Sequence, residues 1–208
     1  MKINEIFLSI QGEGLNMGLP TVFVRTAGCN LRCSYCDTKY AYDNGENLSI
    51  NDIAGKVSKF HTKRVCITGG EPLLQEDMLK LISRLRGYSI SIETNGSLDI
   101  SLLPQSVMVS LDIKCPSSGE TGKMRFQNLK RLTKKDQAKF IIGTSKDYKF
   151  AKDIVTEYRL LEKTNVIFTP VGGIKAKPLV KNVLHDSIDA RIGIQAHKAI
   201  WGVKRRGV

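Results

Sequence analysis

A chain of 208 residues with 41% hydrophobic and 25% charged residues can bury a substantial core, and we expect one catalytic domain over residues 1–208. No apolar run is long enough to cross a bilayer and no apolar signal segment opens the chain, which excludes a membrane-spanning protein and predicts a cytoplasmic one. The formal net charge of +12 would suit nucleic acid, but residues 121–181, with 15 Lys and Arg against 5 Asp and Glu, lack interleaved aromatic residues, which favours a solvated basic face.

The first half of the chain alternates predicted strands and helices. Residues 6–10 are a β-prone run that ends in a glycine-rich turn, and residues 21–27 predict a second strand. Residues 49–60 predict a helix, because a serine N-cap precedes apolar residues at helical spacing. Residues 65–68 predict a short buried strand, and a second amphipathic helix is expected over residues 74–85.

The alternation continues through the second half. The remaining predicted elements are strands at residues 89–94, 107–113, 138–142, 166–171 and 191–196 and helices near residues 124–134, 147–161 and 175–185. Strands separated by helical stretches indicate βα units and a parallel sheet. A closed eight-fold βα barrel takes about 250 residues, so this shorter chain predicts an α/β fold built as a partial, open parallel βα barrel of about six strands. The active site is expected at the C-terminal ends of these strands.

Three cysteines, Cys29, Cys33 and Cys36, lie within eight residues directly after the second predicted strand. Such a set suits a soft metal centre, and we interpret it as the binding loop of a 4Fe-4S cluster. This cluster commonly takes four thiolates, so three cysteines leave one iron free to bind another molecule. A zinc site would need a fourth ligand nearby, whereas His61 lies beyond a predicted helix, and a disulfide would need an oxidising compartment. Zinc and a disulfide remain open as less favoured alternatives.

Residues 69–72, with the sequence Gly-Gly-Glu-Pro, follow the predicted strand at residues 65–68. The two glycines leave room for a ligand beside the backbone and Glu71 offers a carboxylate for an ammonium group, although the same residues could only be a turn that opens a helix. Together with the upstream CxxxCxxC loop, this motif resembles that of the radical S-adenosylmethionine (SAM) enzymes. The resemblance implies that the free iron binds SAM, whose reductive cleavage starts radical chemistry. It also implies an external electron donor such as flavodoxin or ferredoxin.

The same resemblance assigns the cofactor contacts. Glu93, at the end of a predicted strand, is expected to hold the ribose hydroxyls, with a capping or solvated acid as the alternative. Lys114 is expected to bind the SAM carboxylate. The expected SAM-binding residues are Gly69, Gly70, Glu71, Glu93, Asp112, Ile113, Lys114, Thr169 and Pro170.

Further motifs narrow the resemblance to one family. They are Ser9-Ile10-Gln11-Gly12-Glu13-Gly14, Arg25 four residues before Cys29, Cys36-Asp37-Thr38, Gln195-Ala196-His197-Lys198, Trp201 and Arg206-Gly207-Val208. This combination closely resembles the 7-carboxy-7-deazaguanine synthase family. The resemblance implies radical ring contraction of 6-carboxy-5,6,7,8-tetrahydropterin to 7-carboxy-7-deazaguanine with loss of ammonia, in biosynthesis of the deazapurine-modified tRNA bases queuosine or archaeosine. It further implies a magnesium requirement and a homodimer.

The family resemblance also assigns the substrate and magnesium sites. A pterin edge alternates donors and acceptors, with which Gln11 and Glu13 are able to pair, and Arg25 suits the substrate carboxylate. Thr38 is expected to ligate magnesium, which prefers oxygen ligands. Taken singly, these residues could instead be a turn, an outward strand residue and a cap, and His197 could be a core histidine. The expected substrate-binding residues are Ile10, Gln11, Gly12, Glu13, Arg25, Thr68, His197 and Val208.

Two other functions remain open from the sequence. A glycyl-radical activating enzyme shares the CxxxCxxC loop but acts on a protein partner, and the Gln11-Gly12-Glu13-Gly14 turn speaks against it. A noncatalytic metal-binding or RNA-binding module would account for the charge of +12. The combined motifs favour the ring-contracting lyase over both.

Overall fold

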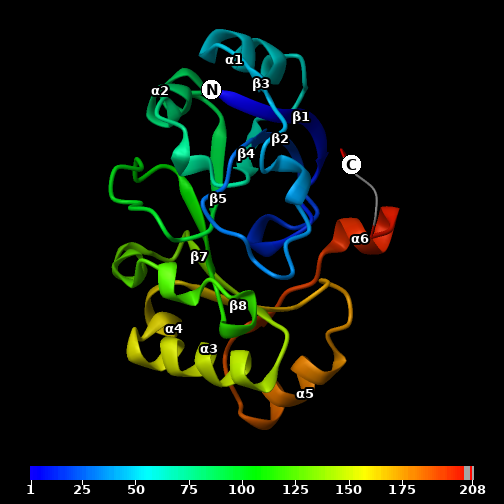
Figure 1. The fold of residues 1–208 in the computed structure, drawn as a ribbon, viewed down its shortest axis with the longest axis vertical. Helices are drawn as coiled ribbons and strands as arrows, with labels where there is room; N and C mark the ends of the chain where they lie inside the picture. Colours follow the sequence, from blue (N-terminus) through cyan, green and yellow to red (C-terminus); the bar gives the residue numbers. More distant parts are fainter. Residues whose placement is uncertain (204–206, 208) are drawn as a thin grey trace.

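The computed structural model describes residues 1–203 and residue 207, and within them nine strands form one sheet (Figure 1). The strands are β1 (Lys2–Ile10), β2 (Pro20–Thr26), β3 (Glu46–Asn47), β4 (Arg64–Gly69), β5 (Ser89–Thr94), β6 (Met108–Ile113), β7 (Gln137–Ile142), β8 (Asn165–Pro170) and β9 (Arg191–Ile192). Their spatial order is β3-β1-β2-β4-β5-β6-β7-β8-β9, with β3 and β9 as the two edges, so the sheet is open. The predicted α/β fold, a partial, open parallel βα barrel, is confirmed.

The sheet is parallel from β2 to β9. The first predicted strand departs from this arrangement, because β1 pairs antiparallel with β2, and β3 pairs antiparallel with β1. The connection between β1 and β2 spans only residues 11–19, whereas a parallel crossover takes a dozen or more residues. The chain therefore starts with a hairpin before its βα units begin.

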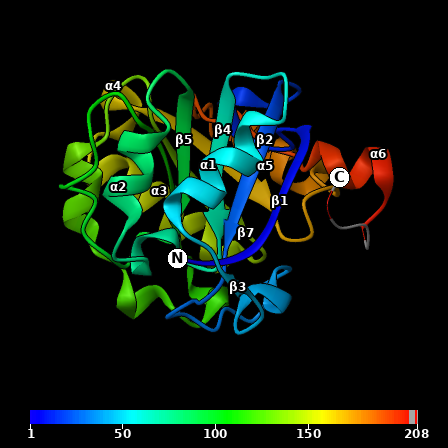
Figure 2. The same ribbon diagram turned by 90° about the horizontal axis from the view of Figure 1, so that it is seen from above.

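Helices α1 to α5 pack on the outer side of the curved sheet (Figures 1 and 2). The helices are α1 (Ile50–Ser58), α2 (Met78–Arg84), α3 (Ser145–Glu157), α4 (Leu160–Lys163), α5 (Lys177–His185) and α6 (Ala196–Trp201). α1 and α3 start with capping boxes, in which Ser49 pairs with Asp52 and Thr144 pairs with Asp147. Among the described residues, no helix has the length and apolar character needed to span a membrane.

Residues 124–134 do not form the predicted α-helix. The 3-10 turns in this region are η5 (Thr121–Lys123) and η6 (Phe126–Arg131). Asn128 is 1% exposed, and its side-chain amide donates to the carbonyl oxygens of Gly96 and Leu98. These bonds fix the segment against the connection between β5 and β6, and such tertiary contacts leave no trace in helical periodicity.

The C-terminal segment also differs from the prediction. The strand expected over residues 191–196 ends at Ile192, and α6 follows from Ala196. The N–H of Gln195 donates to the carbonyl of Gly173 at 2.7 Å, and the N–H of Ala196 donates to the carbonyl of Gly12 at 2.9 Å. These two bonds bring the start of α6 to the turn that follows β1.

Two apolar clusters hold the helices to the sheet. One packs α1 and α2 on β2, β4 and β5, and it includes Ile53, Ile67 and Leu81. The other packs α3 and α5 on β6 to β8, and in it the rings of Phe140 and Phe168 meet edge to face at 5.5 Å. Full burial of each such side chain contributes about 1.5–3 kcal/mol. The core thus fixes the parallel strands so that their C-terminal ends meet at one edge of the barrel.

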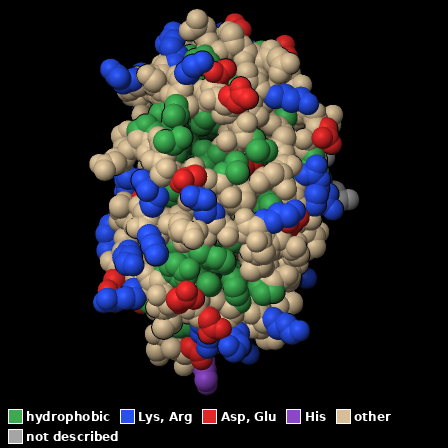
Figure 3. All heavy atoms as spheres, turned by 60° about the vertical axis from the view of Figure 1, so that its left-hand side comes forward, with side chains coloured by type: hydrophobic (Ala, Val, Ile, Leu, Met, Phe, Trp, Pro, Cys, Tyr) green, Lys and Arg blue, Asp and Glu red, His purple; other side chains and the backbone are tan. Residues whose placement is uncertain are grey.

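Basic side chains are spread over the surface. Figure 3 shows one face on which Lys and Arg lie scattered among acidic and apolar side chains, without a single basic block. Several are paired locally, as in Lys149 with Asp153 on α3, at 2.9 Å, and Arg159 with Glu162. Such pairs are typical of a solvated face.

Candidate active site

A cavity of about 660 Å³ lies at the C-terminal ends of the parallel strands. The cavity gathers the predicted site residues Ile10, Gln11, Gly12, Glu13, Arg25, Cys29, Cys33, Cys36, Thr38, Thr68, Gly69, Gly70, Glu93, Asp112, Lys114, Thr169, Pro170 and His197. Folding therefore brings together motifs from both ends of the chain. Val208, also assigned to the substrate, lies outside the described residues.

The cysteine loop, residues 29–36, follows β2 and crosses one side of the cavity. Neighbouring segments hold it from outside. The N–H of Ser34 donates to the carbonyl of Ser118 at 3.0 Å, and the N–H of Arg32 donates to the Glu120 carboxylate at 2.6 Å. The three thiols of the loop are partly exposed and line the same cavity.

These thiols fit a 4Fe-4S cluster better than a single metal ion. In the described part of the chain, no three His, Cys, Asp or Glu side chains are placed to hold one ion. Structural zinc takes four ligands around one ion, with Zn–S of about 2.3 Å, whereas each thiolate of an iron-sulfur cluster binds its own iron. Cys66 and Cys115 are fully buried outside the cavity lining, so no fourth cysteine completes the set. All five cysteines are free, which argues against a disulfide.

The glycine pair after β4 lies against the start of the cysteine loop. A Cβ on Gly70 would overlap the carbonyl oxygen of Gly28, and a Cβ on Gly69 would overlap the backbone of Thr26. The pair therefore allows two backbone segments to touch beside Cys29, while both glycines still line the cavity.

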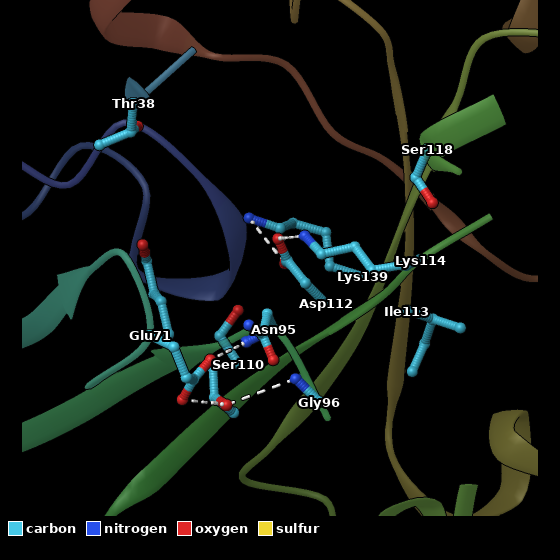
Figure 4. A network of polar contacts seen from close by, with 12 residues as sticks. Thr38, Glu71, Asn95, Gly96, Ser110, Asp112, Ile113, Lys114, Ser118 and Lys139 are labelled. Atoms are coloured by element: carbon cyan, nitrogen blue, oxygen red, sulfur yellow. Dashed lines mark hydrogen bonds and ion pairs between the residues drawn. The ribbon is translucent and has the colours of Figure 1, made fainter. Parts of the chain in front are cut away.

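The carboxylate of Glu71 does not face the cavity, so its predicted role as the partner of an ammonium group is wrong. The side chain is 0% exposed and accepts hydrogen bonds from the N–H groups of Leu73 and Asn95 and from the hydroxyl of Thr94. Figure 4 shows it directed at the end of β5. Burial raises the pKa of Glu71, and these hydrogen bonds act in the opposite direction. Glu71 therefore ties the loop after β4 to the end of β5.

Glu93 lies among residues assigned to the substrate. Its Oε1 accepts a hydrogen bond from Gln11 Nε2 at 3.1 Å, and its Oε2 accepts one from the Thr68 hydroxyl at 2.8 Å. The predicted ribose contact is therefore placed beside the predicted substrate contacts. Together these side chains offer donors and acceptors to the edge of a heterocycle.

Lys139 on β7 is a buried site residue that the sequence analysis missed. Its Nζ lies 2.7 Å from Glu13 Oε2. It also lies 3.1 Å from Asp112 Oδ1, and Lys114 Nζ lies 3.2 Å from Asp112 Oδ2 (Figure 4). Burial lowers the pKa of Lys139, but the negative charges of Asp112 and Glu13 raise it by more, so the net pKa is well above its usual value. Asp112 Oδ1 makes this ion pair without a well-directed hydrogen bond. Ile113 is 0% exposed and packs in the core, so its side chain does not provide the predicted cofactor contact.

Arg25 faces the cavity from β2. Its Nε pairs with Glu5 at 2.6 Å, and the Tyr40 hydroxyl donates to the same carboxylate oxygen at 3.2 Å. The guanidinium lies 5.8 Å from the ring centroids of both Phe7 and Tyr40. A guanidinium has five N–H donors, so Glu5 can orient Arg25 while other donors serve an anion.

The start of α6 closes one side of the cavity. Gln195 Nε2 donates to Glu13 at 2.6 Å, and Lys198 Nζ lies 2.7 Å from Asp37 Oδ2. Burial raises the pKa of Asp37, but Lys198 and other hydrogen bonds lower it to about 2. The Thr38 hydroxyl donates to the second oxygen of Asp37 at 3.0 Å. The sequence motif had identified Gln195 and Lys198, but helix α6, which begins after Gln195 and contains Lys198, was not predicted.

His197 belongs to the same segment and touches the turn after β1. A Cβ on Gly12 would overlap the imidazole ring, so glycine is required for this contact. Burial lowers the pKa of His197 below its usual 6.5, which favours a neutral ring in the cavity at neutral pH.

Residues 23–135 match the Radical SAM superfamily. The chain is 39% identical to the 7-carboxy-7-deazaguanine synthase of Koribacter versatilis, in an alignment that covers 100% of both chains. It is 38% identical to the synthase of Clostridium acetobutylicum, with 100% of this chain and 99% of the relative covered. The synthase of Methanospirillum hungatei is also 38% identical, with 96% and 85% covered. The chain belongs to the 7-carboxy-7-deazaguanine synthase family.

Membership of the 7-carboxy-7-deazaguanine synthase family confirms the resemblance drawn from the motifs. It does not favour the glycyl-radical activating enzyme or the noncatalytic module. The radical SAM superfamily implies a 4Fe-4S cluster and SAM, and the cysteine loop fits such a cluster. The fold matches a crystal structure of QueE from Escherichia coli with a TM-score of 0.74 and 23% identity, over 94% of each chain.

Proposed function

We propose that this chain is a radical SAM lyase that converts 6-carboxy-5,6,7,8-tetrahydropterin to 7-carboxy-7-deazaguanine with loss of ammonia. The proposal rests on sequence identity of 39% and 38% to two synthases of that name, in alignments that cover the whole of this chain. One cavity that contains the cysteine loop, the glycine pair and the predicted substrate residues supports it. The product would feed synthesis of a deazapurine-modified tRNA base, queuosine or archaeosine.

Cys29, Cys33 and Cys36 are the proposed cluster ligands. Burial raises the pKa of the Cys29 and Cys33 thiols, so binding of the cluster as thiolates must release protons. When bound, the cluster and SAM supply the radical that removes hydrogen from the substrate. The Lys114 ammonium suits the SAM carboxylate, and the other proposed SAM contacts that line the cavity are Gly69, Gly70, Glu93, Asp112, Thr169 and Pro170.

The substrate is proposed to lie over the paired side chains of the cavity. Gln11 and Glu13 offer amide and carboxylate groups to the pterin edge, and Lys139 Nζ lies 2.7 Å from Glu13 Oε2. Arg25, oriented by Glu5, would bind the substrate carboxylate. The remaining proposed substrate contacts are Ile10, Gly12, Thr68, His197 and Val208. These groups orient the substrate and exclude water, which is the protein's contribution in cofactor-dependent chemistry.

Magnesium is proposed to bind beside the Thr38 hydroxyl. Magnesium retains several waters and needs few protein ligands, so one hydroxyl and a substrate carboxylate suit it. Replacement of Thr38 by alanine should leave the iron content unchanged and abolish stimulation by magnesium. Equal stimulation of the variant and the wild type would contradict this site.

A homodimer is proposed to cover the exposed edge of the barrel. Among the described residues, β3 pairs only with Lys2 and Ile3 of β1, and Leu8 further along β1 is 44% exposed. Light scattering after gel filtration should give twice the chain mass of 23.1 kDa. Residues 1–208 are proposed to act as one catalytic domain, in the cytoplasm, with electrons from a carrier such as flavodoxin or ferredoxin and with no nucleic-acid partner.

An anaerobic assay tests the proposed function. Reconstituted protein would be reduced and incubated with carboxytetrahydropterin, SAM and magnesium, and we expect 7-carboxy-7-deazaguanine and ammonia in equal amounts. The matched control is Cys29→Ala, which should lack both the cluster and the product. SAM cleavage by wild-type protein without the deazapurine product would overturn the substrate assignment.

A further inference from the structure

Asn95 lies directly after β5 and points at a proposed cluster ligand. Its Nδ2 is 3.8 Å from the sulfur of Cys29, and the residue is only 6% exposed. An amide N–H that donates to a sulfur stabilises negative charge on that sulfur.

The orientation of the Asn95 amide is fixed by its neighbours. Its Oδ1 accepts hydrogen bonds from the Ser97 N–H at 3.0 Å and from the Ser97 hydroxyl at 2.7 Å. A backbone N–H can only donate, so the oxygen must face Ser97 and the nitrogen must face Cys29. Nδ2 also donates to Asn30 Oδ1 at 3.0 Å, and Asn30 Nδ2 donates to the Ser97 hydroxyl at 2.8 Å. Asn30, Asn95 and Ser97 thus form a closed ring of hydrogen bonds.

Glu71 fixes the backbone of Asn95 from behind. The Asn95 N–H donates to Glu71 Oε2 at 2.6 Å, and the Thr94 hydroxyl donates to Glu71 Oε1 at 2.8 Å. Figure 4 shows Glu71 and Asn95 facing each other at the end of β5. Because Glu71 is fully buried, the backbone at Asn95 is held in place, and the Asn95 side chain stays beside Cys29.

We propose that Asn95 is a positioning residue that raises the reduction potential of the cluster by donating a hydrogen bond to the Cys29 thiolate. The proposal rests on the proposed function, since it requires a cluster on the cysteine loop. Reduction adds one electron from a low-potential carrier and neither forms nor breaks a bond. The added negative charge lies partly on the sulfurs, so an N–H donor stabilises the reduced form more than the oxidised form.

Redox titration of reconstituted protein without SAM, followed by electron paramagnetic resonance of the reduced cluster, tests the proposal. Asn95→Leu has nearly the same size but no donor, and Asn95→Asp keeps the acceptor toward Ser97 while it places a carboxylate oxygen at the sulfur. We expect the ratio of reduced to oxidised cluster at a fixed potential to fall about tenfold in Asn95→Leu, which corresponds to about 59 mV for one electron. The fall should be larger in Asn95→Asp.

The matched control is Asn30→Ala. It breaks the ring of hydrogen bonds but leaves the Ser97 contacts of Asn95 and its bond to sulfur, so its ratio of reduced to oxidised cluster at a fixed potential should stay within about twofold of the wild type. Wild-type potentials in both Asn95 variants, with full iron and sulfide content, would overturn the proposal. An equal shift in Asn30→Ala would overturn it too, because any disturbance of the loop would then suffice. Failure of the wild type to hold a cluster would instead refute the proposed function.

Discussion

The polar side chains of the cavity already have partners within the protein, whereas the thiols of the cysteine loop have few. Within the cavity, the charged groups already pair with one another, as Lys139 does with Glu13 and Asp112 and as Glu93 does with Gln11. The cysteine loop instead presents three free thiols, of which Cys29 accepts a hydrogen bond from Asn95. The loop is held by bonds of its backbone and of the Asn30 and Ser34 side chains. Folding alone therefore prepares the proposed substrate surface, whereas the loop needs an inorganic group to satisfy its sulfurs.

The largest effect on cluster binding and activity is expected from Cys33→Ala. Loss of one of three ligands should abolish cluster binding and product formation, while the free energy of unfolding of the apo protein changes by less than about 1 kcal/mol, because Cys33 is partly exposed. Iron and sulfide analysis together with urea unfolding would measure both. The control is Cys115→Ala, which should keep the cluster although the buried site loses packing. A cluster retained at full occupancy in Cys33→Ala would contradict the ligand assignment.

Lys139→Met tests whether the paired charges of the cavity stabilise the folded protein. Removal of this ammonium leaves Glu13 without its buried cation and leaves Asp112 with Lys114 alone, so we expect a loss of about 3–5 kcal/mol in the free energy of unfolding at pH 7. Lys149→Met on the exposed face of α3 is the control and should change stability by less than about 0.5 kcal/mol. Urea unfolding of both variants would measure this, and similar values for the two would refute the structural role of Lys139.

The pH dependence of Lys139→Met sharpens the same test. Burial raises the pKa of Asp112, but Lys139 and Lys114 lower it more, so the net pKa lies below the usual 3.8. Asp112 therefore contributes stability that is present above pH 3.8 and is lost as the pH falls through its lowered folded pKa. The stability difference between wild type and Lys139→Met should shrink as the pH falls below 3.8. A constant difference between pH 7 and pH 3 would contradict this linkage.

Gly70→Ala is expected to have a smaller effect on stability but to disturb the loop directly. The new Cβ would overlap the Gly28 carbonyl, so the backbone must shift, at a cost of about 1–3 kcal/mol. Iron content after reconstitution should fall. Gly55→Ala, in the exposed part of α1 where a Cβ meets no atom within 4 Å, should instead stabilise the protein by about 0.5–1 kcal/mol. Equal iron content in the two variants would argue against a role of Gly70 in placing the loop.

Lys198→Met is expected to have the smallest effect. Its partner Asp37 is 52% exposed, so solvent screens the pair and the loss should not exceed about 1 kcal/mol at pH 7. Asp37 has its pKa lowered to about 2, so this contribution is present above pH 3.8 and disappears as the pH falls toward 2. Hydrogen exchange should nevertheless speed up in α6. Unchanged exchange there would show that the pair does not hold the helix.

Much of the fold followed from local patterns. A serine N-cap and apolar periodicity located α1, and the alternation of strands with helices predicted the open barrel. The segment around Asn128 was mispredicted because its amide bonds to a loop that is distant in sequence. The antiparallel orientation of β1 was not predicted, although the connection of only nine residues to β2 is too short for a parallel crossover.

The site was predictable where a motif was short and contiguous. The cysteines and the glycine pair were found directly, and folding placed them beside one another. Lys139 was missed because a lysine in a strand ordinarily reads as an outward residue, and only the barrel places it between two acids. The carboxylate of Glu71 was misassigned because the motif names the residue without showing which way its side chain turns.

The contact between α6 and the turn after β1 has a consequence for biosynthesis on the ribosome. Gln195 bonds to Glu13, 182 positions earlier, so the wall that these residues form stays open until nearly all of residues 1–195 have left the exit tunnel. Domains emerge from the N-terminal side at about 5–20 residues per second, which leaves the cysteine segment waiting for roughly ten seconds or more without its cover. Until the last helix docks, the cavity that the cysteine loop lines lacks the wall formed by Gln195 and Glu13.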